Sequence, residues 1–135
     1  MAHFLNALLD DAGAHWVVTH AGSGAVVVDT LEAAFDSASR RRGLLGRDEL
    51  APGSGLVIAP SNAVHTFFMR FPIDVVFLDR QGRIVKMRGD LRAHRLAACL
   101  RGFAVLELPA GTIARTGLVR GDLLTISRRE GSEPA

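Results

Sequence analysis

The sequence is poor in cysteine, tyrosine and lysine, and each shortage narrows its interpretation. The single cysteine, Cys99, excludes an internal disulfide and is compatible with a reducing compartment. Tyrosine is absent and tryptophan occurs once, so few aromatic platforms exist for stacking nucleic-acid bases. Fifteen of the sixteen cationic residues are arginine, yet the net charge of +2 demands no polyanionic partner. These features argue against nucleic acid as the partner.

Long apolar runs are also missing. No run approaches the roughly 18 residues that a membrane span requires. The N-terminal apolar patch is short, has no basic region before it and is interrupted by Asp10 and Asp11. We therefore expect no secretory signal, no membrane association and a cytoplasmic location.

The hydrophobic content predicts a globular domain. Apolar residues make up 48% of the 135 residues, which suits a single domain spanning 1–135 with its own core. Only 128–135 is typical of a polar C-terminal tail.

Short apolar runs separated by turn residues about every ten positions predict a mainly β fold, a β-rich α+β domain with two short helices. Apolar spacing predicts an amphipathic helix over 4–9, whereas 31–38 fits a helix or a strand equally well. The segment 88–101 is expected to be a loop with a helical turn. The expected strands lie at 15–19, 25–28, 56–59, 65–69, 73–78, 83–87, 103–108 and 123–127. A sandwich or barrel follows, and barrel closure would remove exposed strand edges.

A weak internal similarity favours the barrel. Residues 41–50 and 115–124 both place Gly-Leu at the end of an expected helical turn, with an aspartate four residues after the leucine. The second copy contains Gly121-Asp122, which resembles the turn motif of double-psi and related cradle-loop barrels. We therefore predict a compact, barrel-like domain, with a cradle-loop or double-psi architecture as one form of it.

The most informative stretch is 65–79, an apolar run that contains a histidine, an arginine and two carboxylates. Strand alternation would place His65, Phe67 and Met69 on one side. Asp74 lies among aliphatic neighbours, where a buried carboxylate must be paired or hydrogen-bonded. Two interpretations stay open: a structural one, with bonds from a turn or from an arginine such as Arg47 or Arg70, and a functional one, with Asp74 at a pocket mouth. Glu107, the other acid inside an apolar run, either faces solvent or pairs with an arginine.

The candidate ligand-binding pocket consists of Arg47, His65, Phe67, Met69 and Asp74, where polar groups and aromatics converge. We expect a non-enzymatic binding or accessory module for an unknown small ligand or peptide. The alternative is a small hydrolase- or isomerase-like enzyme with His65 and Asp74 as acid and base. No histidine or cysteine pair has metal-ligand spacing, so neither a metal nor a cofactor is predicted.

Several spaced motifs, in order along 38–124, carry a family resemblance. They are Arg42-Gly-Leu-Leu-Gly-Arg47, Gly53-Ser-Gly-Leu56, His65-Thr-Phe-Phe-Met-Arg-Phe-Pro-Ile-Asp74, Leu106-Glu-Leu-Pro-Ala-Gly-Thr112 and Gly121-Asp122. In these the chain resembles the domain-of-unknown-function family 192. The resemblance implies a small, mostly β domain and implies no reaction.

Overall fold

The computed structural model describes residues 2–11 and 13–129, which form ten strands and three short helices. The strands are β1 (Trp16–His20), β2 (Val26–Val28), β3 (Thr30–Ala34), β4 (Ser54–Ile58), β5 (Ala63–His65), β6 (Ile73–Leu78), β7 (Ile84–Leu91), β8 (Leu96–Ala98), β9 (Ala104–Pro109) and β10 (Leu124–Arg128). The helices are α1 (Asn6–Asp10), α2 (Ser37–Arg42) and α3 (Thr112–Thr116). The domain is mainly β, as predicted, with one more helix than the predicted two.

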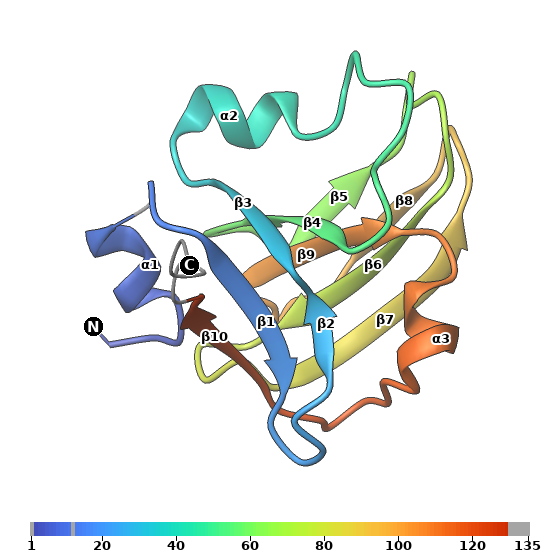
Figure 1. Cartoon of the computed structure of the whole chain (residues 1–135). Coiled ribbons are helices and arrows are strands. Elements are labelled where there is room, and N and C mark those ends of the chain that lie inside the picture. The colour runs from blue at the N-terminus through green and yellow to red at the C-terminus, as the bar shows by residue number, and fades with distance from the viewer. Residues whose placement is uncertain (1, 12, 130–135) are drawn as a thin grey trace, which may run out of the picture.

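The strands form three sheets, with the orders β10-β1-β2, β3-β4-β9-β6-β7 and β5-β8 (Figure 1). Neighbours are antiparallel except for the parallel pair β3 and β4. An isolated bridge between Arg83 and Leu123 lies near the starts of β7 and β10, but it does not join the sheets into a closed barrel. The predicted barrel-like closure, with its cradle-loop or double-psi form, is therefore wrong.

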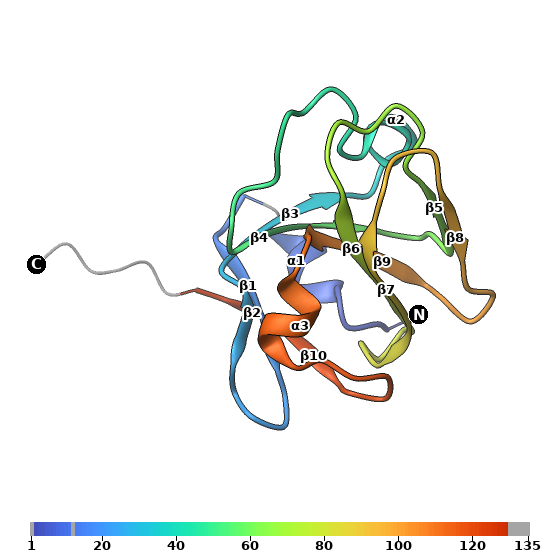
Figure 2. The ribbon, with the colours of Figure 1, turned by 90° about the vertical axis from the view of Figure 1, so that its right-hand side faces the viewer.

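Layering, rather than closure, buries the five-stranded sheet. One face packs against α1 and the three-stranded sheet in a core that includes Trp16, Val76 and Leu106. The other face packs beneath the segment around α2 and β8, in a core that includes Leu44, Phe77 and Ala97. Both views show α2 at the same end of the molecule as the β5–β8 pair (Figure 2). Because both faces are covered, the central strands β6 and β9 are buried along their length, apart from Pro109 at the end of β9.

The segment 31–38 contains both of the elements left open by its sequence. β3 ends at Ala34, and Asp36 then caps α2 by accepting a hydrogen bond from the Ser39 amide at 2.8 Å. That bond also holds the pKa of Asp36 below its ordinary value. Gly43, with φ +47, ends α2 and turns the chain back over the sheet.

The predicted strand at 65–69 is wrong, because β5 ends at His65. The next side chain, Thr66, is fully buried, and its hydroxyl donates to the Arg92 carbonyl at 2.5 Å and accepts from the Arg95 amide at 2.9 Å. This clamp bends the chain, and Phe68 has φ +66 with 81% of its surface exposed. Alternation therefore does not hold across this stretch.

The prediction of a loop with a helical turn at 88–101 is wrong for half of the segment, which is strand. β7 continues to Leu91, and β8 pairs with β5 so that Leu96 lies opposite His65 and Ala98 opposite Ala63. Within the described residues, no helix is long and apolar enough to cross a membrane.

Candidate functional site

A cleft of about 380 Å³ lies between α2 and β5. Its wall residues come from α2, from the turn that follows it and from β5, while β4, β9 and Met69 contribute the deeper part. The lining residues that the argument uses are Arg40, Arg41, Arg42, Ala63, His65 and Glu107. The volume lies within the range of pockets that hold small molecules.

Among the residues that the structure describes, Glu107 is the only acid that lines this cleft. It sits in the middle of β9, directly opposite Leu56 on β4 and Val75 on β6. Its residue surface is 3% exposed, and no described side chain or amide donates a hydrogen bond to its carboxylate. Among the described residues, every side-chain oxygen that is completely enclosed has a hydrogen-bond partner. Because the Glu107 oxygens have none, they are not completely enclosed and reach the open space of the cleft. The prediction that Glu107 faces solvent or pairs with an arginine is therefore wrong in both of its forms.

Burial among aliphatic neighbours raises the pKa of Glu107 to about 7, because the low-polarity surroundings disfavour the charged form. The positive charge of Arg47 opposes this rise. Arg47, however, directs its guanidinium to Glu32, with Nη1 and Nη2 donating to the two carboxylate oxygens at 2.7 and 3.2 Å. It therefore acts on Glu107 through space and does not neutralise it by contact.

The mouth of the cleft is cationic. Arg40 donates from Nη1 to the carbonyl of Phe35, which ties this guanidinium to the chain before α2. Arg41 and Arg42 are exposed, and neither guanidinium forms an ion pair or hydrogen bond with another described residue. Two arginines are thus free to make bidentate contacts with an anion.

The structure brings together some of the residues predicted for the pocket and separates the others. His65 and Met69 line the cleft. Arg47 lies close enough to influence Glu107 but does not line the cleft. Phe67 lies beside His65, with ring centroids 5.5 Å apart, on the outer surface.

Asp74 lies outside this cleft and is 1% exposed. Its Oδ1 accepts from the Asp90 amide and its Oδ2 from the Ile113 amide, each at 2.8 Å. The partners are backbone amides rather than Arg47 or Arg70, which bind Glu32 and Asp48 instead.

A row of rings continues from the cleft across the surface. Phe67 lies 6.1 Å from His94, and Phe68 meets His94 edge-on at 6.2 Å. His94 has φ +63, and Phe68 also has a positive φ. The Thr66 clamp therefore holds two phenylalanines outward next to the cleft mouth.

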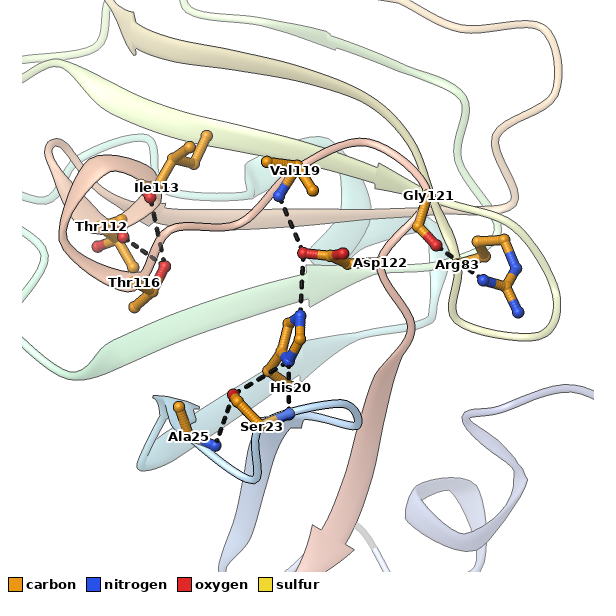
Figure 3. Close-up of polar contacts among 10 residues, drawn as sticks. All are labelled: His20, Ser23, Ala25, Arg83, Thr112, Ile113, Thr116, Val119, Gly121 and Asp122. Carbon is orange, nitrogen blue, oxygen red and sulfur yellow. Dashed lines mark hydrogen bonds and ion pairs between the residues drawn. The ribbon is translucent and has the colours of Figure 1, made fainter.

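A second polar cluster lies in the three-stranded sheet (Figure 3). His20 Nε2 lies 2.9 Å from Asp122 Oδ2, and Nδ1 accepts from the Ser23 amide at 3.0 Å with the Ser23 hydroxyl at 3.1 Å. Asp122 also accepts from the Val119 amide at 3.0 Å. This cluster connects the β1–β2 turn to the turn before β10, and no described cavity adjoins it.

The described residues contain no group of three or more histidine, cysteine or acidic side chains that could hold a metal ion. The acid on the cleft floor was missed as a site residue in the sequence. The available signal was Glu107 itself, an acid between Leu106 and Leu108 in an otherwise apolar run.

Comparisons with known proteins agree with the sequence resemblance. The family model DUF192, described as uncharacterized ACR, matches residues 17–126. None of the curated proteins matches the chain significantly. A crystal structure of a proposed transcription regulator from Sinorhizobium meliloti 1021 is 27% identical, with a TM-score of 0.71 over 81% of this chain and 89% of that one. A protein of unknown function from Novosphingobium aromaticivorans DSM 12444 is 24% identical, with a TM-score of 0.70 over 81% of each chain, and shows the same fold.

Proposed function

The chain belongs to the DUF192 family, whose description assigns no activity, and we propose that it is a non-enzymatic binding module whose α2–β5 cleft holds a small polar ligand. The observation that carries this proposal is Glu107, a buried carboxylate that receives no hydrogen bond from the described residues and opens into the cleft. A buried acid without a hydrogen-bond donor lowers the stability of the fold. A ligand that donates a hydrogen bond to Glu107 would offset this cost, which gives the carboxylate a role in binding.

The surroundings of Glu107 support the same function. The cleft has apolar neighbours on its floor, one acid inside it and cationic groups at its mouth, so it offers both signs of charge to a small polar molecule. The composition, with its single cysteine, supports a cytoplasmic location for this module.

One observation favours the alternative, a small hydrolase- or isomerase-like enzyme. The pKa of Glu107 lies at about 7, where a group serves well as a general acid or base, and His65 lines the same cleft. In that case Glu107 replaces Asp74 as the carboxylate, because both oxygens of Asp74 accept bonds from backbone amides.

A regulatory role like the one proposed for the Sinorhizobium protein receives little support from the helices. They span five, six and five residues among the described part of the chain, too short for a recognition helix that lies in a major groove.

The test places a bulky tryptophan in the cleft and, as a control, a tryptophan at a matched position outside it. Ala63 lines the cleft, whereas its register partner Ala98 is also exposed, on the other strand of the same two-stranded sheet, and does not line the cleft. A defined mixture of amino acids, organic acids, amines and sugar phosphates is screened by ligand-observed NMR. We expect at least one compound to bind the wild type and Ala98→Trp but not Ala63→Trp. Equal binding by Ala63→Trp, or no binding compound, would overturn the proposal.

A further inference from the structure

We infer that the ligand of the α2–β5 cleft is a small zwitterion, with an ammonium group on Glu107 and an anionic group on Arg41 and Arg42. This inference rests on the proposed function and names the chemical class of its ligand. It depends on the opposite hydrogen-bonding capacities of the inner and outer parts of the cleft.

The inner part can only accept hydrogen bonds once Glu107 is ionised. A carboxylate has two acceptor oxygens and no donor, and these oxygens reach the cleft without a described partner. The residues opposite Glu107, Leu56 and Val75, offer no polar group. The donor must therefore come from a molecule inside the cleft.

An ammonium group suits this position better than a hydroxyl group. An ammonium neutralises the buried negative charge and donates charge-assisted hydrogen bonds, which are roughly twice as strong as neutral ones. A hydroxyl leaves the charge in place and thus leaves most of the desolvation cost uncompensated. Burial raises the pKa of Glu107 to about 7, and a positive charge beside the carboxylate would lower that pKa.

The arginine side chains in the outer part of the cleft can only donate. Arg41 and Arg42 at the end of α2 carry no anionic partner among the described residues. Arginine binds carboxylate and phosphate groups in a bidentate manner, so the outer end of the ligand is an anion.

The other charged groups around Glu107 are already occupied or lie at the wall. Arg47, from the segment after α2, is bound to Glu32, and Arg40 is bound to the Phe35 carbonyl. His65 lines the wall from β5. None of these groups takes the place of the ammonium, because Arg47 and Arg40 are bound to other partners and no ion pair joins His65 to Glu107 among the described residues.

The test compares three series of linear carboxylates of increasing length that carry an amino, a hydroxyl or a methyl group at the far end. Binding is measured by isothermal titration calorimetry with the full chain and with Glu107→Gln, Arg41→Gln/Arg42→Gln and Ala98→Trp. In the wild type we expect the best amino compound to bind at least ~10-fold more tightly than its hydroxyl and methyl counterparts. Glu107→Gln, which keeps the shape of the side chain, removes that preference, and the double arginine variant weakens all three series.

A second measurement detects the protons that are released when the ligand binds. At about pH 6 the free carboxyl group is mostly protonated, so binding of an ammonium releases up to about one proton per ligand, seen as a dependence of the heat on the buffer. Glu107→Gln releases none. Ala98→Trp should behave as the wild type in both readouts.

The contrary outcomes separate the two proposals. If the hydroxyl or methyl series binds as tightly as the amino series and Ala63→Trp abolishes that binding, the zwitterion is wrong and the proposed binding cleft stands. If no series binds, the zwitterion is wrong, and the screen with Ala63→Trp then decides the proposed function independently.

Discussion

The carboxylate of Asp74 accepts a hydrogen bond at 2.8 Å from the amide of Ile113, 39 residues further along the chain. Its other oxygen accepts from the amide of Asp90 at the same distance. Asp90 has φ +49 and lies where the pairing of β6 with β7 shifts register. One buried side chain therefore fixes both the irregular end of β7 and the start of α3.

Replacing Asp74 should destabilise the fold without affecting the cleft. Asp74→Ala leaves two amides without their acceptor, which predicts a loss of about 3 kcal/mol in the free energy of unfolding. Asp74→Asn turns one oxygen into a donor that faces another donor, with a loss of roughly 2 kcal/mol. Urea denaturation measures both values. The exposed Asp48→Asn serves as the control and should change stability by less than about 0.5 kcal/mol, and a similarly small effect of Asp74→Ala would remove the structural role.

Much of the fold was predictable because most strands are short apolar runs between turn residues. Strands β1, β4, β6, β9 and β10 lie within one or two residues of their predicted positions. The prediction failed after His65, because an ordinary-looking Thr66 is clamped by residues 92–95, a contact that local periodicity does not contain. The barrel was wrong for a similar reason: apolar strands indicate burial on both faces, but not whether closure or additional layers provide it.

The site was less predictable than the fold. Asp74 and Glu107 are both acids inside apolar runs, and the local sequence does not indicate which of them is hydrogen-bonded within the fold. The difference lies in distant backbone: amides of Asp90 and Ile113 reach Asp74, whereas β9 pairs Glu107 with Leu56 and Val75. Such contacts depend on sheet order, which local patterns do not encode.

Gly82 should tolerate no side chain. Its φ is +91, and a Cβ there would lie 2.5 Å from the Leu124 carbonyl oxygen. Gly82 also accepts a hydrogen bond from the Leu124 amide at 2.9 Å, so the chain cannot move away without losing it. Gly82→Ala should therefore cost about 3 kcal/mol by urea denaturation.

Gly24 provides the control for that substitution. Its φ is +75, but a Cβ there would meet nothing within 4 Å. Gly24→Ala should cost only about 1 kcal/mol, the penalty of the left-handed backbone alone. Equal costs at the two positions would show that the close approach of Leu124 is unimportant.

The His20–Asp122 pair should contribute to stability at neutral pH and not in acid (Figure 3). The Val119 amide, followed by His20, holds the pKa of Asp122 below its ordinary 3.8. Because the folded-state pKa is lowered, this contribution is present above about 3.8 and disappears as the pH falls through the folded-state value. Asp122→Asn should lower the free energy of unfolding by about 1 kcal/mol near pH 6.

The comparison that isolates this pair is Ser23→Ala. That change removes the hydroxyl near Nδ1 but keeps the Ser23 amide that donates to the same nitrogen. Its effect on the melting temperature should be smaller than that of Asp122→Asn and should not depend on pH in acid. A constant deficit for Asp122→Asn down to about pH 3 would contradict the assignment.

Glu107 should make the protein less stable as the pH rises from acid to neutral. Its pKa is about 7 in the folded protein and 4.5 ordinarily, so the folded state binds the proton more tightly than the unfolded state. The corresponding stabilisation is complete below about 4.5, declines across the interval and is lost above about 7. The gap between the two values corresponds to at most roughly 3 kcal/mol. Glu107→Gln should remove this dependence and make the protein more stable than the wild type at about pH 8.

Urea denaturation at several pH values between 5 and 8 tests this expectation. The exposed Glu49→Gln is the matched control and should keep the pH dependence of the wild type, because that side chain is solvated in both states. A gain in stability for Glu107→Gln at about pH 8 would show that the ligand-free cleft retains a destabilising carboxylate, as expected for a group kept for binding. If Glu107→Gln instead followed the pH dependence of the wild type, the buried carboxylate would be compensated within the fold, and the cleft would lose the group on which its proposed function depends.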